Sequence, residues 1–222
     1  MNENILSCKE INAILKRMNL KADFDADFDL PNVFVSHRHC WDHGYESYEC
    51  DHSCENPSGD DDTLYYGTRR QFYRDLETIC DFTQEYLLSK KCESMIVAPC
   101  VHYGHFEYGC AKNDIYYEVR SFFAPYRIRS NSRAGVVVPN GDRKAIEMVL
   151  EGAFRAVTDL CLLLPEAQIL IVPYHHCGYS VYSAVSPSEE LGRIRKIISK
   201  YAGEMLCHLC SNARTAAETV VQ

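Results

Sequence analysis

Cysteine and histidine gather at three places in this 222-residue chain, and their chemistry suggests metal binding. The groups are Cys100, His102 and His105; Tyr174, His175, His176 and Cys177; and His37, His39, Cys40, Asp42 and His43. Thiolate and imidazole ligands suit a borderline-soft ion such as Zn²⁺, and a catalytic zinc takes three protein ligands and one water. We therefore predict a zinc site with Cys100 and Cys177 as ligands and with His175 or His176 as the third. The alternative is that both cysteines are small buried residues in tight turns.

A second candidate metal site lies in the same polar stretch as the third group. Cys40 and His43, and then Cys50 and Cys54, have the spacing of zinc knuckles. A closed four-ligand site there would order a loop that has too little apolar content to order itself. The alternatives are a plain polar loop or a contribution to the first site.

One further cysteine pair has the spacing of a redox motif. Cys207 and Cys210 form a CxxC at the expected C-terminal end of a helix. The helix dipole disfavours a thiolate at that end, whereas thioredoxin-type motifs lie at a helix N-terminus. We therefore do not expect redox activity from this pair.

The elements that must position these groups follow from the apolar pattern. Short apolar runs predict buried strands at 32–36, 95–98, 134–138 and 169–172. Helical periodicity predicts amphipathic helices at 4–18, 69–90, 142–164 and from Ser186 to about residue 209, while 105–128 has no clear pattern. The first two groups above follow the strands at 95–98 and 169–172, and the third follows the strand at 32–36.

The alternation of apolar strands and amphipathic helices predicts an α/β fold with a mainly parallel sheet flanked by helices. A Cys/His-rich polar loop at 37–62 and a flexible tail at 211–222 complete a single domain spanning 1–222. Parallel sheets bind ligands outside the carboxyl ends of their strands, so we expect the three groups to meet at one edge.

Composition excludes several classes of function. The net charge of −8 disfavours a nucleic-acid partner, and no apolar run reaches the roughly 20 residues of a membrane helix. Twelve cysteines without a secretory signal favour reduced thiols and a cytoplasmic location. We expect a small-molecule substrate, and a homodimer is compatible with the sequence.

Residues 93–185 resemble the β-class carbonic anhydrases. In that family a buried strand ends in Cys-x-Asp-x-Arg, an Arg-Asn-Ala-Gly segment and a helix follow, and a second buried strand ends in His-x-x-Cys-Gly. Here the first strand reaches Cys100, the segment 129–135 stands near the Arg-Asn-Ala-Gly position, and the second strand leads to Cys177 and Gly178. The resemblance implies zinc and a metal-assisted hydration or hydrolysis of a small electrophile.

The sequence departs from that family at the residues that orient the zinc-bound water. His102 occupies the family's Asp position, Gly104 its Arg position, and Tyr174 the position of its metal-binding His. The resemblance then implies that His102 accepts a proton or supports a zinc ligand, and that Tyr174 donates to the substrate.

A rival first strand is 32–36, because Cys40 and Asp42 keep the family's Cys-x-Asp there and make Asp42 a candidate catalytic carboxylate. Spacing to Cys177 favours Cys100. The alternative function is a non-catalytic, zinc-stabilised binding or regulatory protein on the same fold.

Overall fold

The structure is a computed structural model that describes residues 4–20, 31–38, 69–99, 114–129, 132–155, 158–174 and 178–210. Its helices are α1 (Cys8–Arg17), α3 (Arg69–Leu88), α4 (Asp114–Phe123), α5 (Arg143–Phe154) and α6 (Pro187–Ile198), with a short 3₁₀ helix at Ala124–Tyr126. Its strands are β1 (Ile5–Leu6), β2 (Asn32–His37), β3 (Ser94–Pro99), β4 (Gly135–Pro139), β5 (Leu160–Leu164), β6 (Ile169–Tyr174), β7 (Gly178–Ser183) and β8 (Met205–Cys210). None of the described helices has the length and apolar character needed to cross a membrane.

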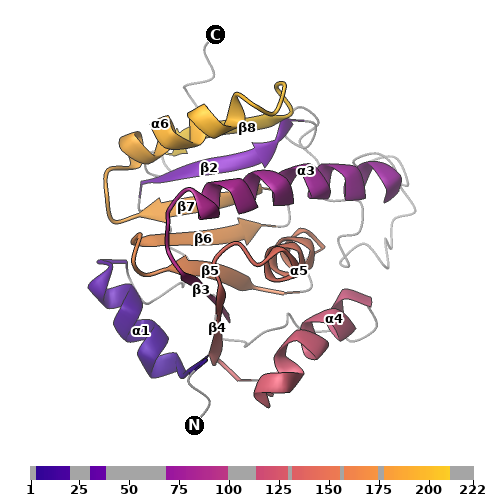
Figure 1. Cartoon of the computed structure of the whole chain (residues 1–222), viewed down its shortest axis with the longest axis vertical. Coiled ribbons are helices and arrows are strands. Elements are labelled where there is room, and N and C mark those ends of the chain that lie inside the picture. The colour runs from indigo at the N-terminus through magenta and orange to yellow at the C-terminus, as the bar shows by residue number, and fades with distance from the viewer. Residues whose placement is uncertain are drawn as a thin grey trace, which may run out of the picture.

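The strands form one eight-stranded sheet in the order β1-β4-β3-β5-β6-β7-β2-β8. Every neighbouring pair in this sheet is antiparallel. The predicted mainly parallel sheet is therefore wrong. Figure 1 shows the alternation directly, because the arrowheads of β2 and β6 point one way and that of β7 points the other.

The error arose where strands were read as helix or were missed. The helix predicted for 142–164 ends at Phe154, and β5 follows it as a separate strand. The helix predicted to reach about residue 209 ends at Ile198, and β8 follows. Strand β7 was not predicted at all. These three strands lie between or beside the predicted ones and are antiparallel to them, and β3 and β4, which were both predicted, are antiparallel to each other as well.

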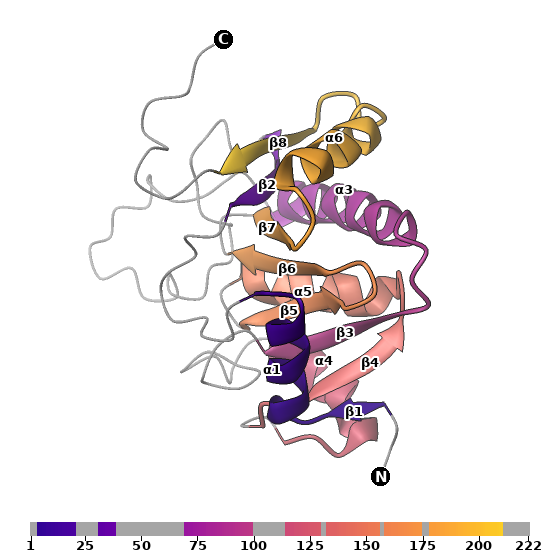
Figure 2. The same ribbon diagram turned by 90° about the vertical axis from the view of Figure 1, so that its left-hand side faces the viewer.

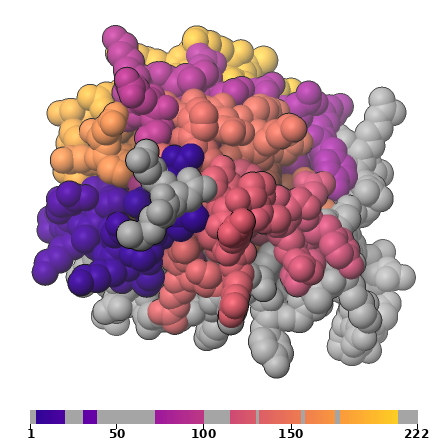
Figure 3. Space-filling view, turned by 60° about the horizontal axis from the view of Figure 1, so that its bottom comes forward, coloured from indigo at the N-terminus to yellow at the C-terminus, as the bar shows by residue number. Residues whose placement is uncertain are grey.

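Helices cover the sheet unequally on its two faces. On one face, α3, α5 and α6 pack over a large apolar core that includes Phe72, Phe82, Phe154 and Tyr179. On the other face, α1 packs over β3, β5 and β6 through a smaller cluster. Figure 3 shows the outer side of α1 at the surface in indigo. The strands are buried on both faces wherever α1 lies, so their apolar runs are continuous.

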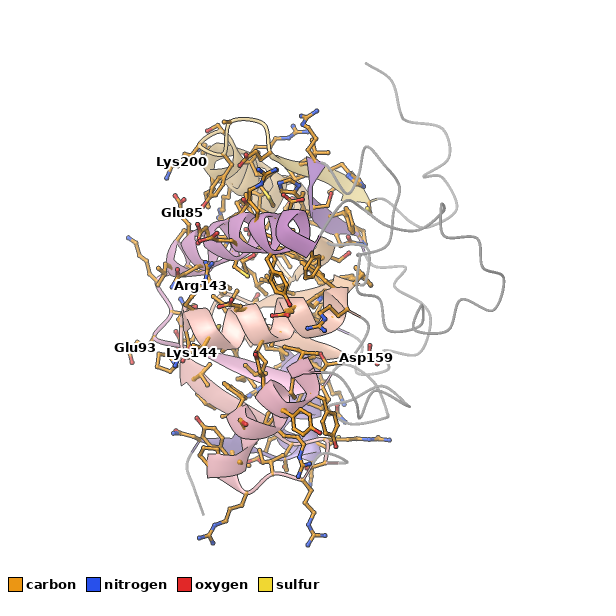
Figure 4. The ribbon with its side chains drawn as sticks, turned by 90° about the vertical axis from the view of Figure 1, so that its right-hand side faces the viewer. Glu85, Glu93, Arg143, Lys144, Asp159 and Lys200 are labelled. Carbon is orange, nitrogen blue, oxygen red and sulfur yellow. The ribbon has the colours of Figure 1, made fainter. Side chains whose placement is uncertain are left out.

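The helices of the larger layer are tied together at their exposed sides. Contacts join α3 to α5 and to α6, and Figure 2 shows α3 and α6 side by side. Lys200, just after α6, forms an ion pair with Glu85 of α3, and Arg143 at the start of α5 forms one with Asp81 of α3. Figure 4 shows Lys200, Glu85 and Arg143 on the outer side of this layer. Exposed pairs of this kind contribute at most about 1 kcal/mol each.

Candidate functional site

The strand ends that precede the three Cys/His groups lie at one edge of the sheet. Strands β3, β6 and β2 occupy the third, fifth and seventh positions, and alternation makes them point the same way. Neighbouring strands lie about 4.8 Å apart, so the ends of β3 and β6 are separated by about 10 Å and those of β3 and β2 by about 19 Å. We name this row of strand ends, which is distinct from the sides of the sheet formed by the outer strands, the shared edge.

Most of the predicted site residues lie outside the described part of the chain. This holds for the first candidate set, comprising Cys100, His102, His175, His176 and Cys177. It also holds for Asp42 and for the second candidate set, comprising Cys40, His43, Cys50 and Cys54. Among the residues that are described, no three His, Cys, Asp or Glu side chains are grouped as a metal site requires. The metal predictions therefore stay predictions.

Tyr174 is the one candidate catalytic residue that the structure describes. It ends β6, is partly buried and packs against the cluster under α1. Its hydroxyl lies 3.2 Å from the hydroxyl of Tyr182, and its ring stacks on Phe34 with centroids 6.4 Å apart. Burial raises the pKa of Tyr182 far above its usual value, with further contributions from Tyr174. The Tyr182 hydroxyl therefore stays protonated at neutral pH, and either hydroxyl of the pair can be the hydrogen-bond donor.

A histidine–aspartate pair occupies the end of β2. The Nε2 of His37 lies 3.6 Å from Oδ1 of Asp75 on α3, and both side chains are almost fully buried. Burial, with a smaller contribution from Glu204, raises the pKa of Asp75 to about 7. The Asp75 carboxyl, beside the His37 imidazole, therefore titrates near neutral pH. The pair can therefore accept or release a proton in the range where enzymes work.

These two candidates face opposite sides of the sheet. His37 faces α3 and its core, whereas Tyr174 packs on the side of α1. Because they lie on opposite faces of the sheet, His37 and Tyr174 could contact a common ligand only beyond the ends of the strands. The structure thus brings the two strand ends to one edge but does not bring His37 and Tyr174 into contact.

Asp159 is a residue at the shared edge that sequence reasoning missed. Strand β5 lies between β3 and β6 and begins at this edge, where Leu160 pairs with Pro99. Leu162 pairs with Ile171 of β6, and continuing this register by three residues places Asp159 opposite Tyr174. Figure 4 looks onto this edge and shows Asp159 there. Because β5 was read as part of a helix, this carboxylate had no predicted position.

Two buried hydroxyl groups near this edge make no hydrogen bond within the described structure. They are Oγ of Ser36, one residue before the end of β2, and Oγ1 of Thr158, one residue before Asp159. Buried hydroxyls are nearly always bonded, and leaving one unpaired costs about 1–3 kcal/mol. The Thr158 hydroxyl packs against Gly152 of α5.

A second polar cluster links α3 to α5 beneath the same edge. The Tyr73 hydroxyl donates to Oε1 of Glu151 at 3.0 Å, and Arg155 donates to the same oxygen at 2.9 Å. Burial raises the pKa of Glu151, although the bonds from Tyr73 and Arg155 oppose the rise. A bonded buried pair of this kind fixes the end of α5, from which the chain continues to Thr158 and Asp159.

The CxxC sequence lies on a strand and not at a helix end. Cys207 and Cys210 belong to β8, where side chains alternate between faces. Residues three apart therefore point to opposite faces, and the two thiols cannot meet. Burial also raises the pKa of both thiols. The helix-end position expected for this pair is therefore wrong, and its lack of a redox role stays a prediction.

Comparison of the chain with models of protein families, with curated proteins and with solved structures finds no match. The resemblance to β-class carbonic anhydrases stays a prediction, and the parallel fold that was expected with it is wrong. The function must therefore be argued from the site itself.

Proposed function

We propose that this chain binds zinc at the shared edge and uses it to add water to a small electrophile. One observation carries the proposal: β3 and β6 end at the same edge, two strand positions apart, with Asp159 on the strand between them. The chain continues from these ends directly into Cys100 and into His175, His176 and Cys177. The ends of β3 and β2 each lie two strand positions from the end of β6, so the sheet order does not separate Cys100 from the rival Cys40 and Asp42 as partner of Cys177; the choice of Cys100 rests on its spacing in the sequence.

The donor set fits zinc. Cys100, Cys177 and one of the two histidines supply two thiolates and an imidazole, which is a ligand set of known catalytic zinc sites. Bound zinc would lower the pKa of a water molecule to about 7 and so supply hydroxide at neutral pH.

The chain's own residues would supply orientation and proton transfer. The Asp159 carboxylate would accept a hydrogen bond from the attacking water and hold it in position. This is the work that the Asp–Arg pair does in the resembled family, and neither His102 nor Gly104 can reproduce that pair. The Tyr174 hydroxyl, which lies 3.2 Å from that of Tyr182, would donate to an oxygen of the substrate. Misplacement of such groups by about 1 Å can reduce the rate about 100-fold.

The test is metal analysis of the whole chain purified without chelator, together with hydrolysis of 4-nitrophenyl acetate. We expect one zinc per chain in the natural protein and in Cys8→Ser, which lies on α1. Cys100→Ser and Cys177→Ser should lose the zinc. Asp159→Asn should keep the zinc and lose at least tenfold in hydrolysis rate. Absence of stoichiometric zinc, or its equal retention in all variants, would disprove the proposal.

A non-catalytic zinc site is the second candidate, favoured by the placement of Tyr174 and His37 on opposite faces. In that case zinc would contribute to folding alone. Both functions predict loss of zinc from the cysteine variants. They differ in that a structural site leaves Asp159→Asn indistinguishable from the natural protein in any hydrolysis assay.

A further inference from the structure

The two outer strands of the sheet differ in length. Strand β1 closes one side with only two residues, whereas β8 closes the other side with six. No other strand of the described chain pairs with the outer side of β8. Natural proteins usually protect a long edge strand with charge, proline or a bulge, because its backbone groups can pair with another chain.

Strand β8 carries none of these protections in its sequence. Its residues are Met-Leu-Cys-His-Leu-Cys, without Lys, Arg, Asp, Glu or Pro. His208 packs on the ring of Phe34 with centroids 5.3 Å apart, and burial lowers its pKa. The imidazole is therefore neutral at pH 7. Leu209 is 40% exposed.

The ladder between β2 and β8 shows which backbone groups point outward. The N–H of Arg38 donates to the carbonyl of Glu204 at 2.6 Å, and this pair continues the register of β2 on β8. Hydrogen-bonded and non-bonded pairs alternate along an antiparallel ladder. Leu206, His208 and Cys210 thus point their backbone groups toward β2, and Met205, Cys207 and Leu209 point theirs away from it.

We propose that β8 pairs antiparallel with β8 of a second copy of this chain, about a two-fold axis at Cys207. A two-fold axis perpendicular to the sheet makes each face of one copy continuous with the same face of the second copy. Odd-numbered residues of β8 therefore pair with odd-numbered residues, and even-numbered residues with even-numbered ones. Centring on Cys207 joins Met205 to Leu209 of the second copy and Cys207 to its own equivalent. All three outward-pointing residues are then used, which gives about six hydrogen bonds between the copies.

This register is free of charge conflicts. On the opposite face Leu206 lies across from His208 of the second copy, and Glu204 lies across from Cys210. No two like charges face each other within the six paired residues. The same strand serves both sides of the interface, so the association closes as a dimer and does not propagate. The result is a continuous sheet through both copies.

The first experiment measures the oligomeric state of the full chain by sedimentation velocity at about 1–50 μM, with Leu209→Pro, Leu209→Lys and Leu209→Thr as variants. Proline at 209 removes an N–H that β2 does not use, so it spares the fold and blocks the interface. Lysine blocks an edge by its charge, whereas threonine keeps the N–H. We expect dimers for the natural chain and for Leu209→Thr, and monomers for the other two. Circular dichroism would check that each variant is folded.

The second experiment locates the axis by cross-linking with copper phenanthroline and oxygen, which together accept the two electrons and two protons released when two thiols form a disulfide. Equivalent Cys207 residues would have Cα atoms about 5.5 Å apart, a separation that a disulfide can span. Cys207→Ser should lose the cross-linked dimer and Cys210→Ser should retain it.

Three outcomes would overturn the proposal. They are a monomeric natural chain across this concentration range, a dimer that survives in both Leu209→Pro and Leu209→Lys, and cross-linking that is independent of Cys207. Each is distinct from the zinc measurements above, so the two proposals stand or fall separately.

Discussion

The hydroxyl of Tyr86 donates a 2.7 Å hydrogen bond to Oε1 of Glu190, and both residues are buried. Tyr86 lies on α3 and Glu190 on α6, so the bond joins the two helices inside the core. Lys90 forms an ion pair with the same carboxylate and lies over the Tyr86 ring, 4.5 Å from its centre. A buried carboxylate with these partners stabilises the helix pair only while all of them are present.

Substitution at this cluster should destabilise the protein in a graded way. Tyr86→Phe removes one hydrogen bond and should lower the free energy of unfolding by about 1–2 kcal/mol. Glu190→Gln leaves the buried ammonium of Lys90 without its carboxylate and should cost about 3–5 kcal/mol. The neighbouring Glu189, whose side chain is 63% exposed, is the matched control, and its change to Gln should alter the value by no more than about 0.5 kcal/mol. Urea unfolding measures all three, and equal effects of Glu189→Gln and Glu190→Gln would contradict the expectation.

Asp75 should make stability depend on pH in a definite direction. Its pKa in the folded protein is raised to about 7, so the folded state binds a proton that the unfolded state releases. The associated stability is complete below about pH 4, the pKa of an unfolded aspartate, and is lost as the pH rises through 7. From pH 5 to pH 8 the free energy of unfolding should fall by about 2 kcal/mol relative to Asp75→Asn.

The control for this measurement is Asp81→Asn on the same helix, where the carboxylate is 57% exposed. That variant should keep the pH dependence of the natural protein. Glu204, before β8, contributes to the raised pKa of Asp75, so Glu204→Gln should lower that pKa and reduce the pH dependence. Parallel pH profiles for the natural protein and Asp75→Asn would show that the carboxyl titrates normally.

Two glycines within helices should respond in opposite ways to alanine. A Cβ at Gly192 of α6 would meet no atom within 4 Å, so Gly192→Ala should stabilise the protein by about 0.5–1 kcal/mol through helix propensity. A Cβ at Gly152 of α5 would lie 2.5 Å from Oγ1 of Thr158. Gly152→Ala should therefore destabilise it by about 1–3 kcal/mol.

A double substitution tests whether contact with Thr158 causes the destabilisation expected for Gly152→Ala. With Thr158→Ala already present, Gly152→Ala should lose most of its cost, because the obstructing hydroxyl and methyl are gone. Thermal unfolding of the four proteins measures the coupling. Additive effects of the two changes would mean that the helix and the following turn are not in contact there.

Cys207 and Cys210 should not form a disulfide within one chain. Their side chains leave opposite faces of β8, and burial raises the pKa of both thiols. Peptide mapping after mild oxidation should find no link between residues 207 and 210 of one chain. Such a link in the folded protein would require β8 to unfold.

The sequence pattern was sufficient for the long helix α3 and for strands such as β3 and β6. Phe72, Leu76 and Ile79 recur at helical spacing, and all three are buried in the core. The runs that formed β3 and β6 are short and wholly apolar, which is typical of strands with both faces covered. In this sheet α1 covers the second face. These antiparallel strands therefore have the continuous apolar runs that are typical of parallel sheets.

The strands that were missed have ambiguous patterns. Leu160, Cys161 and Leu164 fit the helical spacing that α5 begins, but all five residues of β5 are buried. A run of consecutive apolar residues cannot be assigned to helix or strand by periodicity alone. Strand direction depends on how many strands are present, so each missed strand also changed the predicted topology.

The candidate site was predictable only in part. Three predicted strand ends do lie at one edge, although the reason is alternation in an antiparallel sheet and not parallel pairing. Asp75 was placed in α3 without any signal that it faces His37, because pairing across distant segments leaves no local pattern. Asp159 could have been found only by recognising that a strand begins after it.

Because β2 lies between β7 and β8 in the sheet, it cannot pair with either neighbour until these later strands have been synthesised. Residues 32–37 pair with residues 178–183 and 205–210, and with no strand that precedes them in the chain. At about 5–20 residues per second, the ribosome needs roughly 7–30 s to make the intervening chain. Strands β3, β4, β5 and β6 pair with one another, with β1 and with β7. They can therefore assemble before β7 and β8 have been made. Until β7 emerges, β2 is an unpaired apolar strand on a nascent chain, and it is the segment on which a chaperone would act.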